Sequence, residues 1–263
     1  MKSSLKYIAS AAFGLSIVLF IAACGKDDAA SPTSGRLRLF NAVADVPTTG
    51  NVDVLVDGVA VNLRNWLTGG TPLVDSTFKY GAGFPANGDS SYLYLTEGAH
   101  NIKINVTGAT TGTLSQDVTI AAGKTSTAFV IDSLAKMGIL IVQDVLPTTK
   151  QGRAFIRIAQ LSPNSPATDA MVRYVKTVSG VATYPDSISA ATNLAYKGVS
   201  DFIEVKAPDS LIVEFRNAGT TRAAVTFAKT ALVAGRCYTI ISRGYVGRTS
   251  PQNLATSSVI QGR

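Results

Sequence analysis

The chain has 263 residues, of which 46% are hydrophobic and 16% are charged, and it contains one histidine and two cysteines. The hydrophobic fraction excludes a disordered chain, and the length allows one large core or two cores of about 100 to 120 residues. One histidine excludes a His-rich metal site, and two cysteines exclude a disulfide scaffold. We therefore predict no metal site, no cofactor and no catalytic residue.

Residues 1–23 have the pattern of a secretory signal peptide. A short basic start, Met1–Lys6, precedes the uncharged apolar run Tyr7–Ile21. A retained membrane helix is the alternative, since the apolar stretch approaches the roughly 17 residues needed to span. The next residues decide against it, because Ile21-Ala22-Ala23-Cys24 resembles the lipobox of bacterial lipoproteins. That resemblance implies that Cys24 is acylated and that acyl chains hold the protein at a membrane.

Residues 24–35 are small, polar and rich in Ser, Pro and Gly, which predicts a flexible tether. Lys26-Asp27-Asp28 resembles the export signal of surface lipoproteins in Bacteroidetes-type cells. The resemblance implies an outer-membrane lipoprotein exposed at the cell surface. An ordinary solvated linker is the alternative for these three residues.

From Arg36 onward, apolar and polar residues alternate in short runs separated by Gly, Asn, Asp and Pro, which predicts an all-β chain. About seven short strands in about 110 residues fit an immunoglobulin-like β-sandwich. The strands predicted for this part are Arg36–Ala42, Val52–Val56, Tyr92–Leu95, Asn101–Val106, Leu114–Ile120, Thr125–Ile131 and Ile139–Val145.

The chain then repeats itself. Arg38 within Leu-Arg-Leu recurs as Arg157 within Ile-Arg-Ile, and Pro47 recurs as Pro166, both 119 positions further on. We therefore predict two tandem sandwiches. Their ranges are 36–146 for the first repeat, 147–151 for the linker and 152–263 for the second repeat.

The repeated residues are similar to the opening signature of the domain of unknown function 4397 family. The matching residues are Arg38, Ala44-Asp45-Val46-Pro47 and Val52-Asp53-Val54 in the first repeat, and Arg157, Ser162-Pro163-Asn164-Ser165-Pro166 and Asp169 in the second. Asn41 and Gln160 depart from the family, which commonly has histidine there. The resemblance implies extracytoplasmic β-sandwich domains, often in tandem on lipoproteins, without an assigned reaction.

Four residues with reactive or charged side chains are predicted to be structural. Asp53 and Asp169 are expected to bond backbone amides or the arginines of their own repeats, rather than to hold a cation. His100 is expected at a surface or strand edge, because no cysteine lies near it in the sequence. Cys237 is expected to be a half-buried small hydrophobe.

A long excursion at 62–91 carries Trp66, Tyr80 and Phe84 among glycines. Long loops on a rigid sandwich often bind ligands, and exposed aromatic rings stack on sugars. The alternative is that Trp66 and Phe84 plug the open end of the sandwich.

Three Asp-Ser-apolar triplets resemble the acceptor of Bacteroidetes-type O-glycosylation. Their serines are Ser133, Ser187 and Ser210. Three such matches in a Ser-rich β protein also arise by chance.

Charge is divided unequally between the repeats. Residues 36–146 hold seven Lys and Arg against nine Asp and Glu, whereas residues 152–263 hold thirteen against six. After Glu214 only basic charges follow, and Arg216, Arg243 and Arg248 among them are candidate ligand-binding residues. Such a field attracts polyanions, which outside a cell are acidic glycans. Solvated strand faces docked on the acidic repeat are the alternative, and no motif indicates nucleic acid.

These features favour a non-catalytic binding or adhesion module with a glycan or protein ligand. A structural lipoprotein that assembles with an envelope protein is the second reading. A hydrolase is the third, and it would need an Asp/Glu pair brought together by folding. The few glutamates, Glu97, Glu204 and Glu214, offer little material for such a pair.

Overall fold

The computed structural model describes residues 33–46, 52–61, 78–85, 92–106, 113–207 and 209–261. The predicted signal peptide, Cys24, most of the tether and Trp66 lie outside these residues. Within the described ranges, no helix has both the length and the apolar character needed to cross a membrane.

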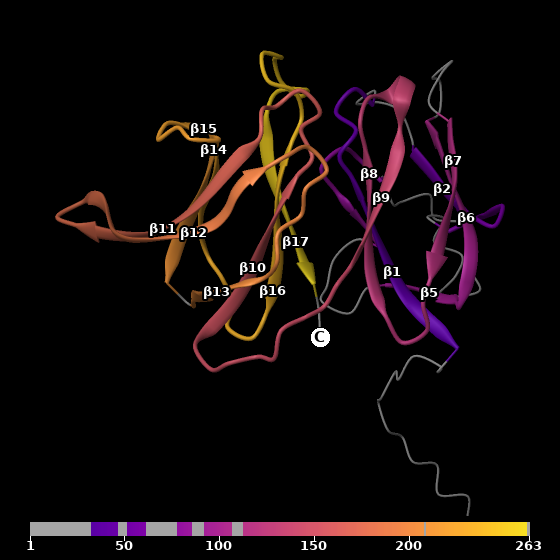
Figure 1. Cartoon of the computed structure of the whole chain (residues 1–263), viewed down its shortest axis with the longest axis horizontal. Coiled ribbons are helices and arrows are strands. Elements are labelled where there is room, and N and C mark those ends of the chain that lie inside the picture. Colours follow the sequence, from indigo (N-terminus) through magenta and orange to yellow (C-terminus); the bar gives the residue numbers. More distant parts are fainter. Residues whose placement is uncertain are drawn as a thin grey trace, which may run out of the picture.

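The first half of the chain is a sandwich of two sheets (Figure 1). Its strands are β1 (Ser34–Asn41), β2 (Val52–Val56), β3 (Val59–Ala60), β4 (Gly83–Phe84), β5 (Leu93–Thr96), β6 (Gly98–Val106), β7 (Thr113–Ile120), β8 (Thr125–Ile131) and β9 (Gly138–Gln143). One sheet has the order β4-β1-β8-β9, with β5 also paired to β1, and the other has the order β3-β2-β6-β7. A short 3-10 helix, η2 (Leu134–Lys136), links β8 to β9. The β1–β8 pair is parallel, and the other pairs are antiparallel.

The second half is built in the same way. Its strands are β10 (Arg153–Gln160), β11 (Thr168–Val178), β12 (Val181–Leu194), β13 (Ile203–Lys206), β14 (Ser210–Asn217), β15 (Ala223–Ala231), β16 (Cys237–Arg243) and β17 (Ala255–Gln261). The two sheets have the orders β13-β10-β16-β17 and β12-β11-β14-β15, and β10 pairs with β16 in parallel, as β1 does with β8. The predicted all-β class and β-sandwich architecture are confirmed.

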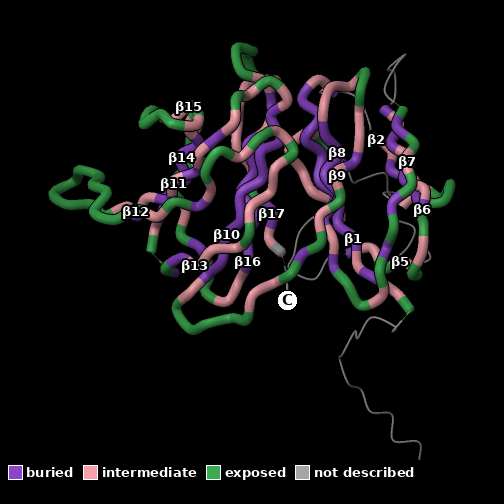
Figure 2. The backbone as a smooth tube through the Cα atoms, in the orientation of Figure 1, coloured by how far each residue is buried: buried purple, intermediate pink, exposed green. Residues whose placement is uncertain are grey.

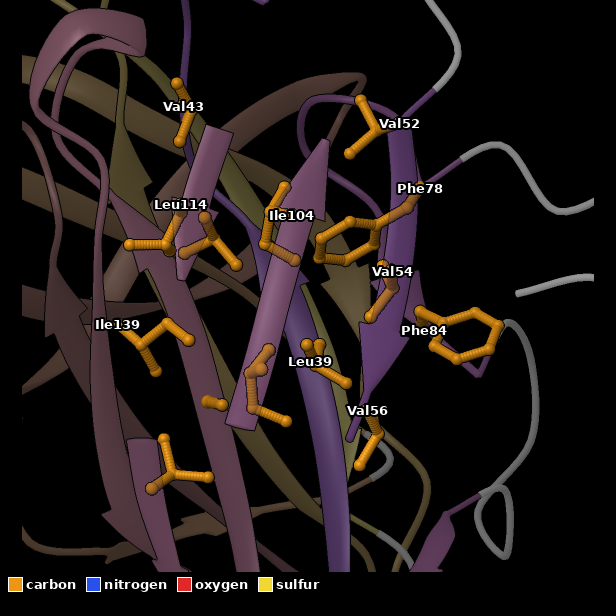
Figure 3. Packing of buried hydrophobic residues seen from close by; sticks show 14 of the residues in the cluster. Leu39, Val43, Val52, Val54, Val56, Phe78, Phe84, Ile104, Leu114 and Ile139 are labelled. Atoms are coloured by element: carbon orange, nitrogen blue, oxygen red, sulfur yellow. The ribbon is translucent and has the colours of Figure 1, made fainter. Parts of the chain in front are cut away.

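The core of the first sandwich follows from alternation along its strands. In β2, Val52, Val54 and Val56 are buried while the residues between them are not, as a strand with one face on the core requires. Figure 3 shows these valines beside Ile104 of β6 and Leu39 of β1. Burial of each such side chain contributes about 1.5–3 kcal/mol, so this interdigitated layer holds the two sheets together.

A third apolar cluster joins the two sandwiches. Its buried members come from β1, β8, β10, β16, β17 and the segments that follow β1 and β10. They are Phe40, Ala42, Phe129, Ile131, Ala159, Leu161, Ile241 and Val259. Because β1 and β10 have the core of their own sandwich on one face and this cluster on the other, their buried residues run consecutively instead of alternating. Long buried stretches accordingly lie on β1, β8 and β10 in the middle of the molecule (Figure 2).

The two signature arginines lie at this junction, and each reaches into the opposite sandwich. The guanidinium carbon of Arg38 lies 4.6 Å from the centre of the Tyr92 ring, and Arg38 donates a hydrogen bond to the carbonyl oxygen of Ile260. The guanidinium carbon of Arg157 lies 4.9 Å from the centre of the Phe202 ring, and Arg157 forms an ion pair with Asp144. The signature position therefore links the two halves of the chain.

Candidate functional site

A depression of about 550 Å³ lies at one end of the second sandwich, between the β14–β15 turn and the β16–β17 loop. We call it the basic depression. Its polar and charged lining comes from both segments. These lining residues are Asn217, Thr220 and Arg222 on the turn, and Arg248 and Asn253 on the loop. Of the described residues that line it, none is acidic. The depression therefore presents two guanidinium groups and two side-chain amides to solvent.

The β14–β15 turn is held in place by a hydrogen bond to Asp169 of β11. One carboxylate oxygen of Asp169 accepts from the amide of Gly219, at 2.9 Å, and the other from the amide of Asn193, at 2.7 Å. These two amides lower the pKa of Asp169, so it stays ionised and bound to the main chain. Of the two partners predicted for Asp169, the backbone amides are the ones found. The corresponding bond of Asp53 stays a prediction.

The β16–β17 loop is fixed by a side chain from another loop. Asn164, between β10 and β11, accepts from the amide of Val246 at 2.8 Å and donates to its carbonyl oxygen at 3.0 Å. Within the loop, the amide of Tyr245 donates to the carbonyl oxygen of Gln252, at 2.8 Å. Both walls of the basic depression are thus held by specific hydrogen bonds.

The two arginines of the basic depression are exposed but differ in how they are held. The guanidinium of Arg248 lies 5.5 Å from the centre of the Tyr245 ring and donates to the side chain of Gln252 at 3.3 Å. In the part of the chain that the structure describes, neither Arg222 nor Arg248 forms an ion pair with a carboxylate. Both positive charges are therefore available to an anion.

Of the three arginines singled out from the sequence, only Arg248 lines the basic depression. Arg216 is half-buried and pairs with Glu214, which also binds Arg173 at 2.9 Å. Arg243 lies 4.0 Å from the centre of the Tyr80 ring and donates to Ser257 at 2.6 Å. Arg216 and Arg243 thus have partners within the protein.

Arg222 is the residue that the sequence reading missed. It follows Gly219 in the turn between two strands, and such hairpin tips are exposed. The sequence signal was available, because Arg222 lies three residues after a turn glycine, and a basic residue in a turn is more accessible to ligands than one within a strand.

Of the three aromatic residues singled out in the 62–91 excursion, the two that the structure describes do not form an open platform. Phe84 is buried in the core of the first sandwich and contacts Phe78 edge-to-face, with 6.4 Å between the ring centres. Tyr80 lies at the junction under Arg243. The buried position of Phe84 therefore fits the alternative that this ring plugs the sandwich. Trp66 lies outside the described residues.

His100 was expected at a surface or strand edge, and this prediction is wrong. It is 8% exposed, and its strand, β6, lies between β2 and β7. Its Nδ1 lies 2.7 Å from a carboxylate oxygen of Asp57, and its Nε2 lies 2.8 Å from the carbonyl oxygen of Thr96. Asp57 is brought there by the tight Asp57-Gly58 turn, which has positive φ at both residues. This partner is 43 positions away, too far for a local sequence pattern to reveal it.

The remaining cysteine, Cys237, is buried in β16 at 1% exposure, deeper than the half-buried position expected.

The family model for DUF4397, a domain of unknown function, matches residues 35–171. The chain belongs to the DUF4397 family. The matched residues cover the described strands of the first sandwich and extend through β10 into β11. That the second half is a second DUF4397 copy stays a prediction. Arg38 and Arg157, on which the resemblance was drawn, both fall within the match and both lie at the junction.

Several solved structures match this DUF4397 chain weakly. A family 26 carbohydrate-binding module from Eubacterium rectale Amy13K, in complex with maltoheptaose, is 12% identical with a TM-score of 0.24, covering 86% of this chain and 95% of that one. A proposed cell adhesion protein from Bacteroides ovatus is 11% identical with a TM-score of 0.27, covering 89% and 98%. Likenesses at these scores carry no argument about the chain. No curated protein matches the sequence.

Two of the three glutamates considered for catalysis, Glu204 and Glu214, are engaged in ion pairs. Glu204 binds Lys150 and Arg153, and Lys150 in particular lowers the pKa of Glu204. Burial alone raises the pKa of Glu214, but its two arginine partners outweigh burial and lower it. Each of these two carboxylates is therefore held ionised by two cations. Such a group is a poor general acid.

The three candidate glycosylation serines lie in different settings. Ser187 is exposed on β12, whereas Ser133 and Ser210 are partly buried, before η2 and at the start of β14. Their modification stays a prediction, and Ser187 offers the best access.

Proposed function

We propose that this DUF4397 chain is a lipid-anchored outer-membrane protein, exposed at the cell surface, that binds acidic glycans without catalysing a reaction. The observation that carries the proposal is the basic depression, where Arg222 and Arg248 face solvent without a carboxylate partner among the described residues.

The charge of the whole second half supports a polyanionic ligand. Residues 152–263 carry a net charge of +7, against −2 for residues 36–146. A field of one sign concentrates ligands of the opposite sign and speeds their capture. The +7 therefore brings a polyanion to the second half of the chain, and the basic depression lies on that half.

The position of the depression relative to the proposed anchor also supports display. In Figure 1, β1 begins at the lower end of the first sandwich, whereas the β16–β17 loop lies at the upper end of the second. A lipid anchor that precedes β1 in the chain would join the molecule at the end opposite the depression.

Binding is tested with the whole chain from residue 25, because the two sandwiches share an apolar interface and neither is expected to stay intact alone. Retention on immobilised heparin at low ionic strength, lost progressively as salt is added, is the expected result. A chain that passes through unretained at low salt would contradict glycan binding.

Anchoring and display are tested in cells. Replacement Cys24→Ser removes the acyl acceptor, and the protein is expected to leave the membrane fraction. An antibody against the second sandwich is expected to label intact cells that carry the unchanged chain. Labelling only after permeabilisation would overturn surface exposure but leave the binding proposal standing.

An envelope-protein partner is the second candidate, favoured by the β11–β12 hairpin. This hairpin projects from the second sandwich (Figure 1), and Val178 and Val181 at its tip are 50% and 65% exposed. A photoreactive residue in place of Val181 is expected to crosslink a protein in the cell envelope if this function is the correct one. The same substitution at exposed Lys229 on β15 is the control.

A further inference from the structure

We propose that Arg222 and Arg248 together bind one carboxylate or sulfate group of an acidic oligosaccharide, and that the amide side chains of Asn217 and Asn253 bind the adjacent sugar hydroxyls. This inference rests on the proposed function, since it names the site and the ligand class of the same binding activity.

The chemistry of the lining matches such a ligand. A guanidinium offers donors in a planar fork that fits two oxygens of one carboxylate or sulfate, which a lysine ammonium cannot do. Carboxamides both donate and accept, as sugar hydroxyls do. An anionic sugar presents this combination of one charged group and neighbouring hydroxyls.

The size of the basic depression also suits an oligosaccharide rather than a bare ion. Its volume of about 550 Å³ falls in the range of roughly 300–1,000 Å³ that is typical of organic ligand sites. The Thr220 hydroxyl donates to the carbonyl oxygen of Asn217 at 2.8 Å, and the Asn253 amide donates to that of Leu254 at 3.2 Å. These bonds orient both ends of the lining before a ligand arrives.

Other basic residues near the basic depression either have partners within the protein or lie outside its lining, so Arg222 and Arg248 are the ones that would contact the ligand. Arg216 and Arg243 are bound to Glu214 and Tyr80, and Lys229 lies on β15 outside the lining. The Asp169 carboxylate under the turn has both oxygens bound to main-chain amides. The remaining cations attract an anionic ligand at long range, whereas Arg222 and Arg248 form the directional contacts with its charged group.

The test separates geometry from charge. Arg222→Lys and Arg248→Lys keep the net charge and remove the planar fork, while Lys229→Arg, at an exposed position of β15, is the matched control. Binding of a heparin hexasaccharide, an oligogalacturonate of the same length and neutral maltohexaose is measured by titration calorimetry on the chain from residue 25. The heparin and galacturonate arms distinguish sulfate from carboxylate as the bound group.

We expect at least one acidic probe to bind, each Arg→Lys variant to bind it about tenfold more weakly, and Lys229→Arg to bind as the unchanged chain does. Because both arginines are exposed and pair with no carboxylate among the described residues, the variants are expected to keep the thermal midpoint of the unchanged chain. Undiminished binding by both Arg→Lys variants would overturn the site and leave the proposed function standing. Equal binding of maltohexaose would overturn the ligand class, and binding of neither acidic probe would overturn the proposed function as well.

Discussion

Asp144 and Arg157 form an ion pair across the junction of the two sandwiches, with side-chain exposures of 0% and 3%. Asp144 follows β9 in the first sandwich, and Arg157 lies in β10 of the second. Thr127 donates to the other oxygen of Asp144 at 2.8 Å, and Arg157 donates to Thr239 at 2.8 Å. Burial raises the pKa of the Asp144 carboxyl, and Arg157 opposes this rise. The pair is therefore satisfied only while the sandwiches stay together.

Replacing one member of this pair is expected to be strongly destabilising. Asp144→Asn keeps the shape of the side chain but leaves the buried charge of Arg157 uncompensated, which typically costs about 3–5 kcal/mol. Urea unfolding of the chain from residue 25 measures the change in the free energy of unfolding. Asp186→Asn, which breaks an exposed pair with Lys206, is the control and should change stability little. Equal small losses in the two variants would show that the junction pair is unimportant.

The strands that face one core were predictable from the sequence. The predicted strands Val52–Val56 and Thr125–Ile131 coincide with β2 and β8, and the other strands predicted for the first repeat are displaced by one to three residues at one or both ends. Alternation and turn residues are local signals, so they place strands well.

The junction and the basic depression were less predictable, because both depend on which faces meet in space. Phe40 and Leu161 look like ordinary core residues in the sequence, and only the packed structure shows that they bury the surface between sandwiches. Likewise, the count of arginines could not separate Arg216, which is paired with Glu214, from Arg222, which is open to solvent. Charge composition identifies a basic region, but partners decide which cations are free to bind.

The shared apolar cluster predicts that the two sandwiches unfold together. Leu161 is fully buried in this cluster, and Leu161→Ala is expected to cost about 2–5 kcal/mol. Calorimetry should show one transition for the unchanged chain and one, at lower temperature, for the variant. Two transitions, of which the substitution moves only one, would contradict coupling between the sandwiches.

Two glycines of the β16–β17 loop should respond differently to the same substitution. Both have positive φ, 84° at Gly244 and 81° at Gly247, so alanine is strained at each by about 1–2 kcal/mol. At Gly244 a Cβ would also overlap the carbonyl oxygen of Asn253 and lie 2.8 Å from the Tyr80 hydroxyl, whereas at Gly247 it meets nothing within 4 Å. Gly244→Ala should therefore lower the free energy of unfolding clearly more than Gly247→Ala, and equal losses in urea would refute this packing.

The His100–Asp57 pair predicts a pH dependence of stability. Because an acceptor faces each ring nitrogen, both nitrogens must donate, which requires the protonated imidazolium. Burial by itself lowers the pKa of His100, but the bonds to Asp57 and Thr96 outweigh it and raise the pKa above its usual 6.5. The same pairing lowers the pKa of Asp57 below 3.8.

The stabilisation from His100 is therefore fully present below the unfolded-state pKa of histidine and is lost as pH rises through the higher folded-state value. The contribution of Asp57 is present above its unfolded-state pKa and is lost as pH falls through the lower folded value. Asp57→Asn keeps a residue type that tolerates the positive φ of this turn but removes the charge. The stability difference between the unchanged chain and Asp57→Asn should be largest near pH 5.5 and shrink toward about pH 8.5. A difference that stays constant over this interval would mean that His100 is neutral in the folded protein, with one of its two acceptors left without a proton.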